Sequence, residues 1–393
     1  LPDPSGRRDD QHPKGSGRTP PARGADGRGA LGSMLREYRS AAAKDALGIP
    51  TGRALAVAGT GATIFRDGWV PGAVLARVAA SHLRVGTFEY AVRLPDETVL
   101  RRLADHAIAR HHPGGAELDD PDPGVLDAVV DAQAELVARW MLVGFVHGVL
   151  NTDNTTISGE TIDYGPCAFM DAFDPATVFS SIDHGGRYAY GNQPAITQWN
   201  LARLAETLIP LVEGDDDASI AAVTAVLETF DDRYRRAWVD GMGTKLGLPR
   251  PSAGEQALFG DLLDLLHAHR VDYTSTFRAL AASLRGDGAP LADLFGGSGA
   301  PDHWAGRWRA SLVERSSDLP AVADAMDAVN PVYVPRNHLV EEALAAAVDG
   351  DLAPFEELMA ILRHPFDERP GADRFARPAP ASFTDTFQTF CGT

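Results

Sequence analysis

Residues 145–166, FVHGVLNTDNTTISGETIDYGP, concentrate side chains that could bind a metal ion. Asp153, Asn154 and Asp163 stand there among Gly and Thr residues that favour turns, so the sequence predicts a loop rather than a helix. Carboxylate and amide oxygens are the ligands that hold a divalent metal ion on the phosphates of a nucleoside triphosphate. A solvated surface hairpin has the same composition, so the residue types alone leave both interpretations open.

The spacing within this loop partly follows the catalytic loop of protein kinases. In that loop an Asn stands seven residues after a His, as Asn154 follows His147 here, and the Asp-Tyr-Gly at 163–165 resembles the metal-binding Asp-Phe-Gly. The proton-accepting Asp would stand two residues after the His, but Val149 occupies that position. Asp153 is then the nearby carboxylate that could accept a proton.

Cationic residues that could hold a triphosphate occur nearer the N-terminus. A kinase-like site needs a Lys on the phosphates and a Glu from a following helix, and Lys14 and Glu37 occur in that order. Arg77 and Arg84, seven residues apart, could clamp phosphate oxygens through forked hydrogen bonds. Lys14 could equally lie on a flexible basic tail, and two such arginines often lie on a solvated face.

The two cysteines, Cys167 and Cys391, could form a redox-sensitive bridge between a loop and the C-terminal tail. One buried thiol and one exposed bystander explain the same two residues equally well.

The elements expected to position these residues are a small β-rich part and a larger helical part. Residues 1–30 lack apolar periodicity and are expected to be disordered. Residues 31–47 predict a helix, and residues 53–92 predict short strands that bend at Asp67-Gly68. Links are expected at 113–124 and 286–301. Further helices are predicted near 97–111, 125–143, 194–213, 218–237, 254–269, 273–285, 318–329 and 339–348. Trp199 is expected in the core, with the apolar stripe Ile196, Leu201 and Leu204.

Composition narrows the range of partners. The chain of 393 residues is 44% hydrophobic and 23% charged, as in soluble globular proteins, and is long enough for two lobes. Its net charge of −18 argues against nucleic acid or an anionic membrane as the main partner. No window approaches the roughly 18 apolar residues of a membrane span, and two cysteines suit a reducing compartment, so we expect a cytoplasmic protein. The first residue is Leu rather than Met, so we expect the natural beginning to be missing.

In this order, the motifs resemble the selenoprotein O family, called YdiU in bacteria, a group of protein-kinase-like pseudokinases. The run from His147 to Leu208 is the most specific part. The matching stretches are KGSGRTP, DGR at 26–28, LREY at 35–38, ALGIPTGRAL at 46–55, RVAASHLRVGTFEY at 77–90, HGVLNTDNTTISGETIDYGPCAFMDAFDP at 147–175, DHGGRYAYGNQPAITQWNLARLAETL at 183–208, NPVYVPRNHLVEEAL at 330–344, HPFDERP at 364–370 and the terminal FCGT.

The resemblance implies that ATP binds in a flipped orientation and that AMP is transferred to Ser, Thr or Tyr hydroxyls of proteins, with release of pyrophosphate. By position, Asp153 corresponds to the proton acceptor, and Asn154 and Asp163 correspond to ligands of Mg²⁺ or Mn²⁺. The residues that correspond to the family's nucleotide contacts and their partners are Lys14, Asp26, Gly27, Glu37, Arg77, Arg84 and Asp163.

Some features depart from the family's pattern. Pro13 stands where an aliphatic strand residue usually precedes the lysine, Ala25 stands where Gly is usual, and nothing ahead of residue 1 corresponds to the family's N-terminal segment. We therefore expect an α+β, protein-kinase-like fold with two lobes: a truncated β-rich N-lobe at 1–93 and a mainly helical C-lobe at 94–393.

The expected function is metal-dependent transfer of AMP from ATP to protein hydroxyls, with no nucleic acid or membrane partner. The alternatives are a catalytically impaired nucleotide-binding pseudokinase that acts as a redox-linked scaffold, and transfer of UMP from UTP. A conventional phosphotransferase is disfavoured by Val149.

Overall fold

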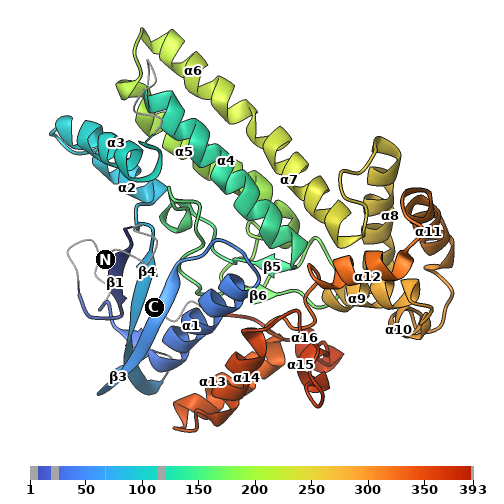
Figure 1. Ribbon diagram of the computed structural model, residues 1–393. Helices are drawn as coiled ribbons and strands as arrows, with labels where there is room; N and C mark the ends of the chain where they lie inside the picture. The colour runs from blue at the N-terminus through green and yellow to red at the C-terminus, as the bar shows by residue number, and fades with distance from the viewer. Residues whose placement is uncertain (1–7, 19–25, 67, 114–120, 391–393) are drawn as a thin grey trace.

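The computed structural model describes residues 8–18, 26–66, 68–113 and 121–390. The chain is α+β: a small antiparallel sheet near the N-terminus is followed by a mostly helical region (Figure 1). In these residues no helix is both long and apolar enough to cross a membrane.

The sheet is built around β4 (Trp69–Ala79). This strand pairs antiparallel with β3 (Arg53–Phe65) on one side, and with β1 (Asp10–Lys14) and β2 (Gly29–Ala30) on the other. The register places His12 opposite Arg77. Among the described strands β1 pairs with β4 alone, and an edge position tolerates Pro13, which has no backbone N–H to donate.

Helix α1 (Leu31–Ala46) lies against the sheet and carries Glu37 (Figure 1). Its Met34 is fully buried with Leu75 of β4. On its other side, the ring of Tyr38 lies 6.3 Å from that of Phe355 in α14 (Ala353–Leu362). Helix α1 therefore joins the sheet to the C-terminal helices, and this packing fixes the direction in which Glu37 points.

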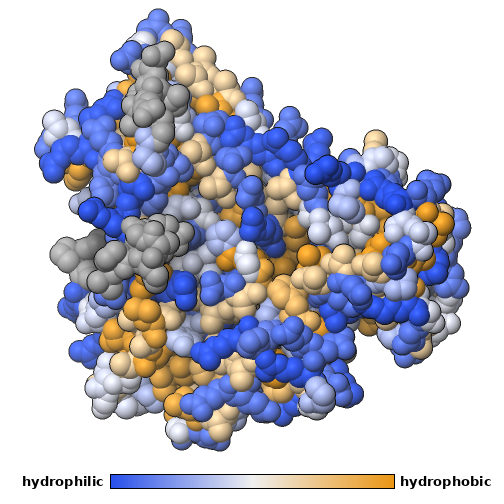
Figure 2. All heavy atoms as spheres, in the orientation of Figure 1, coloured by the Kyte–Doolittle hydropathy of each residue, from blue (hydrophilic) through white to orange (hydrophobic). Residues whose placement is uncertain are grey.

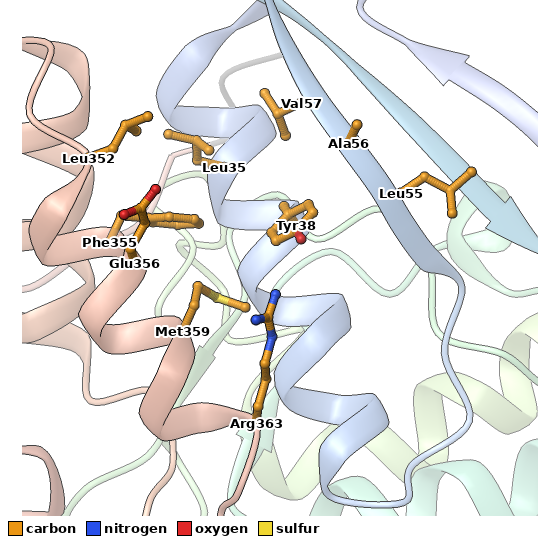
Figure 3. Close-up of a pocket in the computed structure, with 10 residues that line it drawn as sticks. All are labelled: Leu35, Tyr38, Leu55, Ala56, Val57, Leu352, Phe355, Glu356, Met359 and Arg363. Atoms are coloured by element: carbon orange, nitrogen blue, oxygen red, sulfur yellow. The ribbon is translucent and has the colours of Figure 1, made fainter.

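A groove of about 520 Å³ lies between α1, β3 and α14 (Figure 3). Its walls are mainly apolar, with side chains such as Leu35, Val57 and Phe355, and its charged lining residues are Glu356 and Arg363. One cation beside one carboxylate does not suit a triphosphate, so this groove is not the candidate nucleotide site.

Exposed apolar side chains gather on the sheet. Strand β3 is exposed along most of its length, and Figure 2 shows apolar atoms over β3 and β4 at the lower left. Leu55, Phe65 and Trp69 are the large exposed apolar residues of these two strands. The sheet is thus less deeply buried than the helical region, whose core surrounds Trp140 and Phe145.

The helical region contains long helices and short connecting elements. The short elements are β5 (Phe145–Val146), β6 (Ala168–Phe169) and the 3₁₀ turns η2 (Thr152–Asn154), η3 (Tyr190–Asn192) and η4 (Ile209–Leu211). The remaining helices are α2 (Val85–Ala91), α3 (Thr98–His111), α4 (Pro121–Leu142), α5 (Gln193–Leu208), α6 (Asp216–Glu228), α7 (Phe230–Lys245), α8 (Ala253–His269), α9 (Tyr273–Leu284), α10 (Ala289–Leu294), α11 (Asp302–Arg315), α12 (Leu319–Asp327), α13 (Asn337–Val348), α15 (Asp373–Ala376) and α16 (Ala381–Thr384).

Several expectations were wrong in part. Residues 1–30 contain β1 and β2, because pairing with β4 supplies order that their composition does not signal. Residues 85–91 form α2 rather than a strand, and the helix predicted at 218–237 is broken at Thr229 into α6 and α7. Helix α4 begins within the expected link at 113–124, and α10 lies within the one at 286–301. Trp199 is 43% exposed rather than buried.

Candidate functional site

The loop that follows His147 is closed by backbone pairing. Strands β5 and β6 pair antiparallel at its two ends. Gly148 has φ +81°, and a Cβ there would lie 2.5 Å from the carbonyl oxygen of Pro166, so only glycine fits. His147 is fully buried; its Nε2 donates to the Ile162 carbonyl at 3.0 Å, and burial lowers its pKa to about 4. His147 is therefore a neutral brace between the start of the loop and the residue before Asp163.

Asp163 is the point at which three cations meet. Its Oδ1 accepts from Lys14 Nζ at 2.9 Å and from Arg77 Nη1 at 2.6 Å, and its Oδ2 pairs with Arg84 Nη2 at 2.8 Å. Burial opposes ionisation, but attraction by Lys14, Arg77 and Arg84 outweighs it, so the pKa of Asp163 lies well below its usual value. Its φ of +56° is a left-handed conformation that non-glycine residues rarely adopt.

Glu37 completes this arrangement from α1. Its side chain, which is 4% exposed, accepts from Lys14 Nζ at 2.7 Å and from Arg77 Nη1 at 3.3 Å. Burial lowers the pKa of Lys14, but Glu37 and Asp163 raise it more, so Lys14 stays charged. We call Lys14, Glu37, Arg77, Arg84 and Asp163 the charged cluster. It has three cations against two carboxylates, and this excess of positive charge suits an anionic ligand.

Asp153 and Asn154 lie next to the charged cluster. Arg84 bonds Asp163 with Nη2 and the backbone oxygen of Asp153 with Nη1 at 2.8 Å, so one guanidinium spans both segments. Helix α2 packs against η2, and a Cβ on Gly86 would lie 2.2 Å from Asp153 Oδ1. Asn154 Nδ2 donates to the carbonyl of Val149 at 2.7 Å, which leaves Oδ1 as the atom of this amide that could bind a metal.

Two side chains of this region carry oxygen atoms of the kind that Mg²⁺ binds. The described residues contain no group of three or more His, Cys, Asp or Glu that could hold a metal ion alone. The amide oxygen of Asn154 and the carboxylate of Asp163 remain. Mg²⁺ is often held by one or two such side chains together with substrate phosphates and water, so these two residues are the ones that could hold it.

The C-terminal part of α1 also helps to position Asp163. Lys44 of α1 is fully buried, donates to Thr161 Oγ1 at 3.1 Å and lies 3.3 Å from the ring centroid of Phe145. Burial lowers its pKa well below the usual value for lysine. Lys44 thereby ties α1 to the segment that leads into Asp163, so one helix sets the positions of both Glu37 and Asp163.

Asp26 and Gly27 lie in a different turn. Asp26 accepts from Arg66 Nη1 and Nη2 at 3.1 and 3.0 Å and from the Arg28 backbone N–H at 3.0 Å, and these bonds lower its pKa to about 2. Gly27 has φ +65°, and a Cβ there would lie 2.1 Å from the carbonyl oxygen of Gly17. These contacts tie the turn to the β3–β4 hairpin, so the structure places Asp26 and Gly27 outside the charged cluster.

Comparison with known proteins decides the family. The model of the family "Protein adenylyltransferase SelO" matches residues 1–363. The chain belongs to the SelO family. A protein nucleotidyltransferase YdiU from Mycolicibacterium paratuberculosis is 57% identical over 399 residues, which cover 100% of this chain and 79% of the relative. Its counterpart in Rhodococcus jostii is 58% identical over 399 residues (99% of this chain and 76% of the relative), and one from Cereibacter sphaeroides is 55% identical over 394 residues (100% and 80%). The family resemblance of the sequence is confirmed.

Two further residues of this SelO protein touch the site and were not singled out from the sequence. His12 Nδ1 accepts from Arg77 Nη2 at 2.9 Å, because a guanidinium can only donate. Burial and Arg77 lower the pKa of His12. The sequence could have indicated His12, because it lies two residues from Lys14 and residues at this spacing share one face of a strand. Gly86 was missed because a contact with Asp153 leaves no local pattern.

Of the two cysteines, the structure describes Cys167 alone. Cys167 is a buried free thiol 3.5 Å from the hydroxyl of Ser40, whereas Cys391 lies outside the described residues. The tail before Cys391 does reach this region, because the Thr389 hydroxyl donates to the Pro166 carbonyl at 2.7 Å. A bridge between the two cysteines stays a prediction.

Proposed function

We propose that this chain transfers AMP from ATP to Ser, Thr or Tyr hydroxyls of proteins and releases pyrophosphate. The observation that carries the proposal is the charged cluster, in which Lys14, Arg77 and Arg84 converge on Asp163 beside Asp153. Membership of a family described as protein adenylyltransferases supports the reaction class. The fold we propose is kinase-like, with an N-lobe that ends near residue 93 and a helical C-lobe.

The cations supply the binding energy for the triphosphate. Lys14, Arg77 and Arg84 would exchange part of their ion pairs with Asp163 for bonds to phosphate oxygens. Glu37 would keep Lys14 and Arg77 in place during this exchange, because it contacts both. Asn154 Oδ1 and Asp163 would hold Mg²⁺ or Mn²⁺, which neutralises charge on the phosphates when bound. Asp26 and Gly27 would contact the nucleotide outside the cluster.

Asp153 is the proposed proton acceptor. The substrate hydroxyl would lose its proton to the Asp153 carboxylate while its oxygen forms a bond to the α-phosphorus. The bond from that phosphorus to the bridging oxygen would break, and pyrophosphate would leave. The arginines would stabilise the charge that develops on pyrophosphate, and most of the rate would come from positioning and electrostatics. Val149 is apolar and cannot take the proton.

The alternative of an impaired scaffold rested partly on Pro13. In the structure Pro13 lies in β1, and Lys14 next to it still contacts Glu37 at 2.7 Å. This observation favours an active enzyme over the scaffold.

Transfer of radioactive label tests the proposal. The protein would be incubated with Mg²⁺ or Mn²⁺ and with ATP labelled on the α- or the γ-phosphate, or with UTP labelled on the α-phosphate. Label from α-ATP alone is expected on protein. Label from γ-ATP would indicate a kinase, label from UTP would indicate UMP transfer, and no label would indicate a scaffold. Asp153→Asn should lose transfer, while Asp105→Asn, an exposed position on α3, should not.

A further inference from the structure

The ring of Trp199 in α5 lies beside two arginines at the surface. The Cζ atom of Arg187 lies 4.7 Å from the centroid of its ring, and that of Arg203 lies 5.3 Å away. Tryptophan is usually well buried, yet this side chain is 43% exposed. We call these three residues the arginine–tryptophan stack. A large ring held at the surface beside two cations is typical of an interaction site rather than of a core.

The stack lies on the helix that anchors the catalytic loop. Asn200, the residue after Trp199, donates from Nδ2 to the Leu150 carbonyl at 3.1 Å and to Thr155 Oγ1 at 2.9 Å. Gln193, at the start of α5, donates to the Phe145 carbonyl at 2.9 Å. Helix α5 is thus bonded to the loop on both sides of Asp153. A protein substrate whose hydroxyl reaches Asp153 must also lie against the surface that surrounds this loop.

The backbone next to Arg187 is held in one conformation. Arg187 and Tyr188 donate their backbone N–H groups to the two carboxylate oxygens of Asp183, at 2.8 and 2.7 Å. The cation–π contact with Trp199 further restricts the position of the Arg187 guanidinium. The stack is therefore preorganised, which lowers the entropy lost when a partner binds.

The charge of the stack contrasts with that of the whole chain. The net charge is −18, so most of the surface repels acidic partners. Arg203 pairs with Glu206, but within the described ranges no carboxylate forms an ion pair with Arg187. The Arg187 guanidinium is thus available for a forked pair with a carboxylate.

We propose that the arginine–tryptophan stack docks an acidic segment of the protein substrate close to the hydroxyl that receives AMP. The inference rests on the proposed function, because it assumes a protein substrate at Asp153. Arg187 binds a carboxylate of the substrate, and the exposed part of the Trp199 side chain packs against the backbone and apolar atoms of the substrate. The stack sets substrate preference without touching the nucleotide.

A pair of peptides tests this inference. Both contain one acceptor hydroxyl; in one it is flanked by Asp and Glu, and in the other by Asn and Gln. We expect the wild-type protein to have a peptide KM at least tenfold lower for the acidic peptide. Arg187→Glu and Trp199→Ala should remove this preference and leave the KM for ATP unchanged. A Lys-flanked peptide should regain affinity for Arg187→Glu. Arg236→Glu, at an exposed position of α7, is the matched control and should behave as wild type.

The design separates two failures. If no peptide receives label from α-labelled ATP, the proposed function fails, and binding of the fluorescent acidic peptide, followed by anisotropy without nucleotide, still tests the docking site. Equal affinity for both peptides, or an unchanged preference in Arg187→Glu, would overturn the docking site itself. Thermal melting of each variant shows that it is folded, and the acidic preference should weaken as salt is added.

Discussion

Replacing Asp163 by Asn separates the two tasks of its carboxylate. The change keeps the shape of the side chain but removes the negative charge shared by Lys14, Arg77 and Arg84. Breaking a buried set of ion pairs by removing one partner costs about 3–5 kcal/mol. The Asp163 side chain is 16% exposed, so we expect a loss of unfolding free energy near the lower end of this range, measured by urea unfolding with tryptophan fluorescence.

The same change should improve the binding of an anion in the absence of metal. A carboxylate and a phosphate charge about 6 Å apart repel each other by about 3 kcal/mol at an effective dielectric constant of 20. The Asp163 carboxylate competes with phosphate for Lys14, Arg77 and Arg84. Removing its charge therefore frees these cations for the phosphate and also removes the repulsion between carboxylate and phosphate. A tenfold change in affinity corresponds to about 1.4 kcal/mol, and we therefore expect Asp163→Asn to bind pyrophosphate at least tenfold more tightly in EDTA. Metal-dependent transfer of AMP should be lost.

Isothermal titration with pyrophosphate measures this effect. Asp171→Asn is the matched control, because Asp171 accepts from Arg336 Nη1 at 2.6 Å in a buried ion cluster that does not include Asp163. Its affinity for pyrophosphate should stay unchanged. Unchanged or weaker pyrophosphate binding by Asp163→Asn would refute the idea that the charged cluster faces the triphosphate.

Two further predictions concern one glycine and one buried lysine. Gly86→Ala places a Cβ 2.2 Å from Asp153 Oδ1, so the carboxylate must turn away. We expect kcat for AMP transfer to fall about 100-fold, the lower end of what general base catalysis contributes, with little loss of stability in urea. Gly254→Ala, on open surface of α8, should leave kcat unchanged. Burial lowers the pKa of Lys245 to about 7, so between about pH 7 and 10 the unfolded chain binds one more proton than the folded chain. The difference in unfolding free energy between the wild type and Lys245→Met should therefore rise by roughly 1.4 kcal/mol per pH unit over this range. A difference that does not change with pH in urea unfolding would contradict the burial of this amine.

The sequence predicted the parts of the site that depend on local spacing. The loop after His147 and the helix that carries Glu37 were located from composition and periodicity, and the structure has both. The meeting of Lys14 with Asp163 could not be derived in this way, because 149 positions separate them and only the tertiary fold brings them together. The roles assigned to these residues came from the family resemblance.

Other misses have identifiable physical causes. Trp199 fits the apolar stripe of α5 but is retained at the surface by Arg187 and Arg203, a contact that hydrophobic periodicity cannot detect. Strand β1 was missed because it is short and polar, and it is ordered by pairing with β4. Both errors arise from partners that are distant in the sequence.

The packing of α1 has a consequence for shortened forms of the protein. Glu37 lies on a helix whose far side is supported by α13 and α14, although neither of them contributes a residue to the charged cluster. A chain cut ahead of residue 337 would retain every residue assigned to nucleotide or metal, but α1 would lose the support of α13 and α14 on the side away from the sheet. The geometry of the charged cluster therefore depends on the C-terminal helices α13 and α14, which support the helix that carries Glu37.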